Sequence, residues 1–296
     1  MKKFSTIIVA LLSVLSLSAA KADFAVELNL SLQSTYLWRG QYLGGLTFLP
    51  DVAIGFDTEN TSFRAGVCSE LSASDWKFTK GNWDADGLYD GTLFLPELDV
   101  YGEYDFFGAS AYVNFYQYFI PQENAPYDAS SHQTEVGLGY SLDHFLGVDL
   151  YVNWYTIVEG DDYQYDDGGL PVVDANGKKK QAFSSYLEVG YNYTFDKAGV
   201  TIGANVGMSP WTSDNYYNTN FGVVNVSARL EKVWELNKCE ITLFGEGSIN
   251  PNMVAQINAA KAAGEPCDYA IYNSNAGQYK TGNQALNGNI GVTFSF

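Results

Sequence analysis

Apolar and polar residues alternate along much of this chain. In the first such stretch, Val26 to Gln33, the sequence VELNLSLQ places aliphatic residues at every second position, with polar residues between them. The alternation continues with Tyr36 and Trp38 on the apolar side and Arg39 on the polar side. Because successive side chains of a strand point to opposite faces, this pattern predicts a β-strand with one apolar and one polar face.

The same alternation recurs in eleven further segments, which with the first make twelve predicted strands. These segments are Phe48–Asp57, Ser62–Ser72, Phe94–Tyr104, Ala109–Phe119, Gln133–Ser141, Val148–Ile157, Ser184–Phe195, Val200–Met208, Phe221–Val233, Cys239–Gly247 and Gln284–Phe296.

The connections between these segments fall into two length classes. Those from even to odd strands are short: Thr58–Thr61, Asp105–Gly108, Asp143–Gly147, Asp196–Gly199 and Glu235–Lys238. After the first hairpin, those from odd to even strands are longer, up to Ser248–Asn283. Short turns at one end and long loops at the other are typical of outer-membrane barrels, whereas a soluble sandwich has no reason to separate them. We therefore predict an all-β fold, a transmembrane up-and-down antiparallel β-barrel of about 12 strands.

The first 22 residues have the features of a cleaved signal peptide. Lys2 and Lys3 precede an apolar stretch, and Ala20-Lys21-Ala22 supplies small residues at a cleavage point. We expect residues 1–22 to be removed and residues 23–296 to form a single barrel domain.

The last strand carries a second targeting feature. Leu286, Ile290 and Val292 share one face with Phe294 and the terminal Phe296. A terminal Phe that closes such an alternation resembles the signal read by the barrel assembly machinery of Gram-negative bacteria. The resemblance implies insertion into the outer-membrane lipid of a Gram-negative bacterium, with that machinery and the lipid as partners.

The first hairpin carries a resemblance to a family. Tyr36-Leu37-Trp38-Arg39-Gly40, followed by Gly44-Gly45, is similar to the opening of the gcw_chp/TorF family of bacterial porins. The similarity covers roughly residues 24–57. It implies an outer-membrane barrel and no settled substrate.

Composition and charge narrow the function. The chain has 22 Tyr, 18 Phe and 6 Trp, and aromatic residues gather where a barrel crosses the membrane–water interface. Removing three lysines with the signal peptide changes the formal net charge from −18 to −21. A field of that sign repels phosphate backbones, so we expect no nucleic-acid partner.

The polar faces of the strands supply the candidate functional residues. If the apolar faces meet lipid, thirteen acids face the interior: Glu27, Asp51, Asp57, Glu70, Glu97, Asp99, Glu103, Glu135, Asp149, Glu188, Glu231, Glu240 and Glu246. Only three arginines, Arg39, Arg64 and Arg229, are predicted to face them.

Two interpretations of this interior remain open. In one, most carboxylates are unpaired and need water, which predicts a porin that passes small polar solutes by passive diffusion and favours cations. In the other, each arginine binds two or three carboxylates and locks a non-conducting structural or surface-interaction barrel.

A phospholipase-like outer-membrane hydrolase is a more remote alternative. The only histidines are His132 and His144, and neither lies in a readable Ser–His–acid motif. We therefore expect no enzymatic activity.

Two loops carry recognisable local patterns. Asn82, Asp84, Asp86 and Asp90 have the spacing of a calcium loop, although Leu93 stands where the bidentate Glu belongs, so we expect no obligatory cofactor. Asn250-Pro251 and Gly264 bracket a predicted short helix over residues 252–263, either folded into the barrel mouth or packed on its rim.

Overall fold

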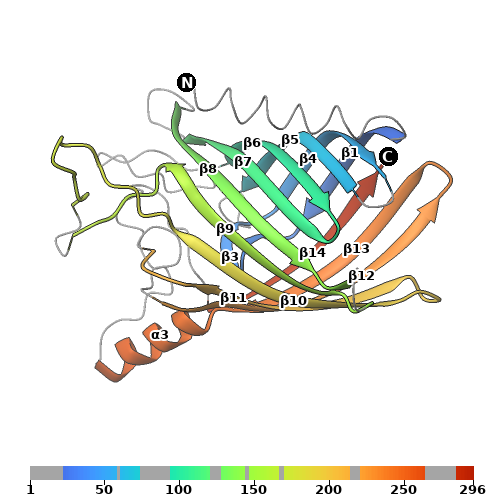
Figure 1. Cartoon of the computed structure of the whole chain (residues 1–296). Helices are drawn as coiled ribbons and strands as arrows, with labels where there is room; N and C mark the ends of the chain where they lie inside the picture. Colours follow the sequence, from blue (N-terminus) through green and yellow to red (C-terminus); the bar gives the residue numbers. More distant parts are fainter. Residues whose placement is uncertain are drawn as a thin grey trace.

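A computed structural model shows the protein as a single closed barrel (Figure 1). The structure describes residues 23–58, 61–73, 94–120, 128–143, 147–166, 170–213, 221–263 and 285–296. The signal peptide and the candidate calcium loop at residues 82–90 lie outside these ranges. Both therefore stay predictions.

Twelve antiparallel strands form the wall, in the order β1-β14-β13-β12-β11-β10-β9-β8-β7-β6-β5-β4. They are β1 (Asp23–Gln33), β4 (Thr47–Asp57), β5 (Thr61–Ala73), β6 (Phe94–Phe106), β7 (Ala109–Ile120), β8 (Asp128–Ser141), β9 (Leu150–Gly160), β10 (Ser185–Phe195), β11 (Val200–Ser209), β12 (Gly222–Leu236), β13 (Cys239–Ile249) and β14 (Leu286–Ser295). The predicted strand count is confirmed. Short turns and long connections also lie at opposite ends, except that the β7–β8 connection (121–127) is shorter than the β8–β9 connection (142–149).

The wall closes between the first and last strands. Asn29 pairs with Ser295 and Leu32 with Val292 in antiparallel register. Phe296 continues the ladder, because its N–H donates to the carbonyl of Leu28 at 3.0 Å. The chain therefore begins its first strand and ends its last at the short-turn end of the barrel (Figure 1).

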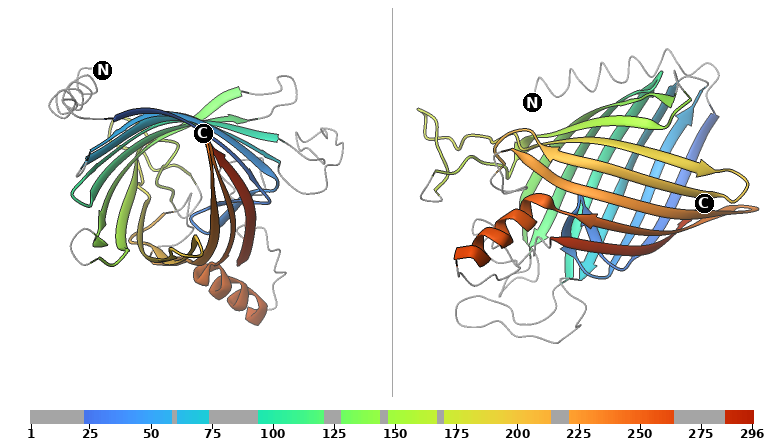
Figure 2. Two further views of the ribbon diagram at one scale, coloured as in Figure 1. Left: turned by 90° about the vertical axis from the view of Figure 1, so that its right-hand side faces the viewer. Right: turned by 90° about the horizontal axis from the view of Figure 1, so that it is seen from below.

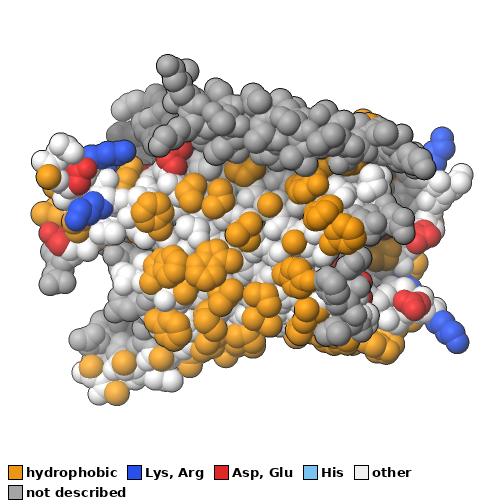
Figure 3. Space-filling view, in the orientation of Figure 1, with side chains coloured by type: hydrophobic (Ala, Val, Ile, Leu, Met, Phe, Trp, Pro, Cys, Tyr) orange, Lys and Arg blue, Asp and Glu red, His pale blue; other side chains and the backbone are white. Residues whose placement is uncertain are grey.

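The outer surface of the wall is apolar. Val26, Leu230 and Leu286 are exposed on it, while polar residues such as Asn225, Asn287 and Asn289 are buried inside. Figure 3 shows hydrophobic side chains across the middle of one face, with charged groups gathered toward the two ends. This is the reverse of a soluble barrel, in which the interior is the apolar side.

The first long connection differs from the prediction. The first strand ends at Gln33, and the residues expected to extend it form a separate hairpin, β2 (Tyr36–Trp38) and β3 (Gln41–Gly44). The prediction that Arg39 lies in a wall strand is therefore wrong. Arg39 occupies the turn of this hairpin, because Arg-Gly adopts the two consecutive positive φ angles (50° and 77°) that a tight two-residue hairpin turn requires.

The predicted helix is confirmed as α3 (Pro251–Ala263). Asn250 is its N-cap, because its side-chain oxygen accepts the N–H of Met253 at 3.1 Å. The helix lies outside the ring of strands (Figure 2), which agrees with packing on the rim rather than insertion into the mouth. Within the described ranges, no helix is long and apolar enough to cross a membrane.

Candidate functional site

The β2–β3 hairpin lies inside the barrel and contacts strands on several sides of the wall. The amide of Asn287 in β14 donates to the carbonyl oxygen of Gly40 at 2.8 Å. The backbone N–H of Thr35 donates to Asn289 in the same strand at 3.3 Å. On another side, Tyr36 is hydrogen-bonded to Glu70 in β5. The hairpin therefore spans part of the interior, which we call the lumen.

Arg39 anchors the hairpin tip to β8. Its two terminal nitrogens donate to the two carboxylate oxygens of Glu135, each at 2.7 Å. Glu135 is 0% exposed, and Tyr116 also donates to it at 3.2 Å. A two-pronged pair of this kind fixes orientation as well as charge, so the tip is held in one position.

Three aromatic rings surround the same guanidinium. Its central carbon lies 4.4 Å from the ring centroid of Trp38, 4.2 Å from that of Tyr155 and 5.0 Å from that of Tyr186. Ring faces attract cations, and a weakly hydrated guanidinium tolerates this dry contact better than an ammonium does. The sequence placed Trp38 on the outer face, whereas the structure turns it into the lumen.

The turn geometry keeps the tip close to the opposite wall. A Cβ added at Gly40 would collide with the side chain of Asn225 in β12. Asn225 in turn donates to Tyr186 and Asn205, at 3.1 Å each. The tip is therefore packed between β8–β10 on one side and β12–β14 on the other.

Arg64 and Arg229 do face the lumen from wall strands, as predicted. Arg64 in β5 binds Glu27 at 2.8 Å and Asp51 at 2.6 Å. Arg229 in β12 contacts Glu231 at 3.2 Å and Glu246 at 3.8 Å. The three arginines thus pair with five of the thirteen predicted inward acids, leaving eight without an arginine.

The remaining predicted site residues have different surroundings. Glu70 and Glu97 are buried directly opposite each other in register, and Asp99 is hydrogen-bonded to Glu97. Glu188 accepts hydrogen bonds from Tyr186 at 2.9 Å and from Tyr151 at 3.2 Å. Asp149 precedes β9 and is exposed at the short-turn end, so it does not lie within the lumen wall.

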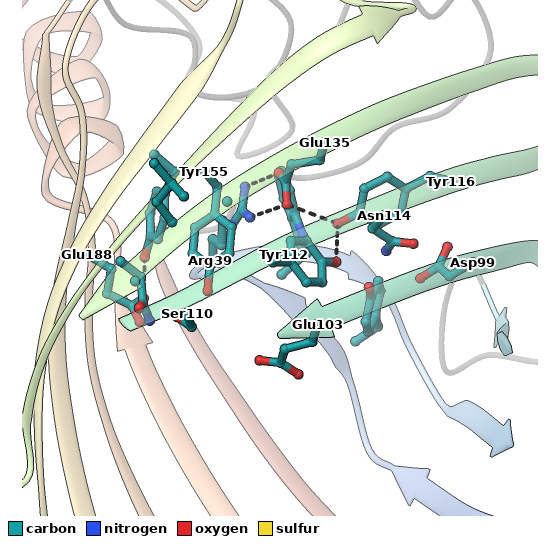
Figure 4. Close-up of a pocket in the computed structure, with 17 residues that line it drawn as sticks. Arg39, Asp99, Glu103, Ser110, Tyr112, Asn114, Tyr116, Glu135, Tyr155 and Glu188 are labelled. Atoms are coloured by element: carbon teal, nitrogen blue, oxygen red, sulfur yellow. Dashed lines mark hydrogen bonds and ion pairs between the residues drawn. The ribbon is translucent and has the colours of Figure 1, made fainter. Parts of the chain in front are cut away.

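A cavity of about 580 Å³ lies between the hairpin and strands β6–β10 (Figure 4). Asp99, Glu103, Glu135 and Glu188 line it together with Arg39. Tyrosines and asparagines form most of the remaining wall, including Tyr36, Tyr112, Asn114, Tyr116, Asn153, Tyr155 and Tyr186. The cavity brings together five of the residues selected from the sequence and adds amide groups, those of Asn114 and Asn153, that were not selected.

His132 does not have the surroundings of a catalytic base. Its ring stacks on Phe115 at 5.8 Å, and in the part of the chain that the structure describes it makes no hydrogen bond to a serine. The neighbouring Ser131 donates instead to Asp161 at 2.8 Å. His144 lies outside the described residues.

The sequence matches no protein-family model and no curated protein. Several solved structures are similar in shape at low identity. The COG4313 outer membrane channel from Pseudomonas putida F1 has 10% identity and a TM-score of 0.41, covering 93% of this chain and 94% of that one. Salmonella typhi OmpF has 9% identity and a TM-score of 0.34, covering 93% and 98%. Pseudomonas putida OprB has 10% identity and a TM-score of 0.30, covering 96% and 95%. All three TM-scores are below 0.5, so we base the functional conclusions on this chain's own residues.

Proposed function

We propose that this protein is an outer-membrane channel that passes small polar solutes by diffusion and favours cations. The observation that carries the proposal is the division of the wall into an apolar outer face and a polar, acidic inner face. Arg or Lys on a lipid-facing surface costs about 2–4 kcal/mol near the midplane, whereas a lumen face tolerates charge.

The excess of acids over arginines supports a hydrated lumen. Of the eight predicted inward acids that have no arginine partner, three line the cavity beside the hairpin: Asp99, Glu103 and Glu188. An ionised carboxylate buried without water or a counter-charge is very costly, so these three groups require solvent. Rings of carboxylates along a water-filled path favour cations.

The β2–β3 hairpin sets the narrowest part of the proposed path. It is held by the Arg39–Glu135 pair and by the bond from Asn287 to Gly40. A solute would therefore pass the hairpin rather than an open cylinder, which limits the channel to small solutes.

Recording in planar lipid bilayers tests the proposal. We expect discrete conductance steps, and a reversal potential in a KCl gradient that corresponds to preferred passage of potassium. Neutralising Glu103, which lines the cavity, by Glu103→Gln should reduce that preference. A reversal potential of the opposite sign would reject the electrostatic part of the proposal.

A non-conducting structural barrel is the second candidate. It is favoured by the number of strands that the hairpin contacts, because β5, β8, β12 and β14 all touch it and a hairpin held on several sides can obstruct the lumen. Protein that is folded, as judged by heat-modifiable migration on gels, and yet gives no conductance would support this candidate instead.

The location and assembly of the barrel belong to the same proposal. A cleaved segment over residues 1–22, insertion directed by Phe296 and kinship to the gcw_chp/TorF family would place it in the outer membrane of a Gram-negative bacterium. Removing Phe296 should reduce the amount of assembled barrel in that membrane. Hydrolase activity, which we do not expect, is tested by incubating detergent-solubilised protein with phospholipid, and activity that depends on His132 would contradict the channel assignment.

A further inference from the structure

The lining of the cavity beside the hairpin has more acidic than basic side chains. Among the described residues of its lining, Arg39 is the one cation, and both of its terminal nitrogens are already bound to Glu135. Asp99, Glu103 and Glu188 line the same space without an ion pair to any other described residue. Glu188 receives two tyrosine hydroxyls, Asp99 is hydrogen-bonded to Glu97 and Asn114, and Glu103 lies directly across from Arg64 in register. The lining therefore holds three carboxylates that have polar neighbours but no ion pair among the described residues.

Two buried oxygen atoms in the cavity wall lack a hydrogen-bond donor. Oδ1 of Asp99 and Oδ1 of Asn114 are both inaccessible to solvent and make no hydrogen bond with any described residue. Asn114 is only 4% exposed, and it lies on β7 beside Asp99 on β6 (Figure 4). Buried polar atoms are normally paired, so these two acceptors show that the described protein groups do not fully satisfy the cavity wall between β6 and β7.

Aromatic rings stand next to these acceptors. The rings of Tyr112 and Tyr155 meet edge to face with centroids 5.9 Å apart, and both line the cavity. Such rings offer apolar contact to an aliphatic chain and attraction to a positive charge. Within the described residues, no group of acidic, histidine and cysteine side chains has the geometry of a metal site. An organic cation with N–H donors therefore fits better than a metal ion.

We infer that this cavity is a binding site for a small organic cation, a protonated amine on a short aliphatic stem. The ammonium group lies against the carboxylates of Asp99 and Glu103, while the stem lies along Tyr112. The volume of about 580 Å³ is in the range of small-molecule sites and exceeds that of a four-carbon amine. The inference refines the proposed function by giving the channel a solute class, but binding does not require that the lumen conducts.

Isothermal titration of the full-length, detergent-solubilised protein with n-butylammonium chloride tests the inference. We expect saturable binding of n-butylammonium, and none of 1-butanol or butyrate at the same concentrations. Asp99→Asn and Glu103→Gln should each weaken binding about tenfold, because each removes a charge-assisted contact. Asp105→Asn is the matched control: it lies on the same face of β6, outside the cavity lining, and accepts a hydrogen bond from Ser62 that asparagine can keep. Its affinity should stay within about twofold of the unmodified protein.

Several results would overturn the site. Equal binding of 1-butanol would mean that charge plays no part, and binding undiminished in both Asp99→Asn and Glu103→Gln would place the cation elsewhere. The absence of measurable binding would have the same effect. Because titration does not depend on ion flow, a barrel that binds the amine and shows no conductance contradicts the channel while supporting the site.

Discussion

Arg39 has an unusual backbone conformation for a bulky residue. Its φ of 50° lies in the left-handed region, which costs a non-glycine residue about 1 kcal/mol or more. The fork to Glu135 and the three surrounding rings compensate for that cost. We therefore regard Arg39 as the residue on which the position of the hairpin depends.

Arg39→Met should be strongly destabilising. Glu135 is 0% exposed, so removing its partner leaves a buried, uncompensated charge, and we expect the free energy of unfolding in detergent to fall by about 3–5 kcal/mol. Arg229→Met is the control, since Arg229 is 42% exposed and its loss should cost no more than about 1 kcal/mol. Adding Glu135→Gln to Arg39→Met should recover part of the loss. Equal effects of the two single changes would show that the Arg39–Glu135 pair contributes no more to stability than the more exposed pairs of Arg229.

Gly40→Ala isolates the packing of the hairpin tip. Gly40 and Gly177 have nearly the same φ, 77° and 78°, but a new Cβ would meet Asn225 at Gly40 and open space at Gly177. Both substitutions place an alanine in a left-handed backbone conformation, which is unfavourable at either site. Only Gly40→Ala also displaces a neighbouring side chain. Gly40→Ala should therefore lower the unfolding free energy by about 1 kcal/mol more than Gly177→Ala. Indistinguishable values from denaturant titration would mean that the tip does not press on β12.

At the scale of the elements, alternation alone predicts most of the wall. The stretch Val26–Gln33 sets its register because one slipped residue would turn every leucine inward. The same rule fails for Tyr36 and Trp38, which continue the alternation but belong to a hairpin in the lumen. The Arg39-Gly40 pair and Gly44-Gly45 are turn signals that could have ended the strand earlier.

The contacts of the candidate site could not be predicted in the same way. Arg39 and Glu135 are 96 residues apart, and Gly40 and Asn287 are 247 residues apart. Local periodicity carries no information about which inward side chains meet across a lumen. It supplied the candidate inward acids, but not the cavity that gathers Asp99, Glu103 and Glu188.

Excision of the hairpin tests its role as an element. Gln33 and Thr47 are directly paired, so residues 34–46 can be replaced by a short Asn-Gly-containing turn without disturbing β1 or β4. We expect a several-fold increase in single-channel conductance, with unchanged heat-modifiable migration on gels. Shortening the β9–β10 connection at residues 171–179, which extends away from the barrel (Figure 1), is the control and should leave conductance unchanged. Unaltered conductance after hairpin excision would show that the constriction lies elsewhere.

At the scale of the whole molecule, the proposed membrane location makes a depth-dependent prediction. Leu230 and Leu236 lie on the outer face of β12, at mid-strand and at the short-turn end, and are 54% and 56% exposed. In lipid bilayers Leu230→Arg should cost about 2–4 kcal/mol of unfolding free energy, and Leu236→Arg about 0–1 kcal/mol. A barrel surrounded by water would tolerate both equally, so equal and small costs in denaturant titrations from vesicles would contradict the membrane assignment.

Closure of the ring joins the two ends of the polypeptide, and this has a consequence for the sequence of events in biogenesis. The hairpin emerges near the start of the chain, whereas its partner Asn287 belongs to the final strand. Docking of the hairpin therefore has to wait until the last strand is in place. A polypeptide that stops before residue 286 would lack β14, which pairs with β1, and also Asn287, which binds the hairpin. The hairpin therefore takes its final position in the lumen only after the whole chain has been synthesised.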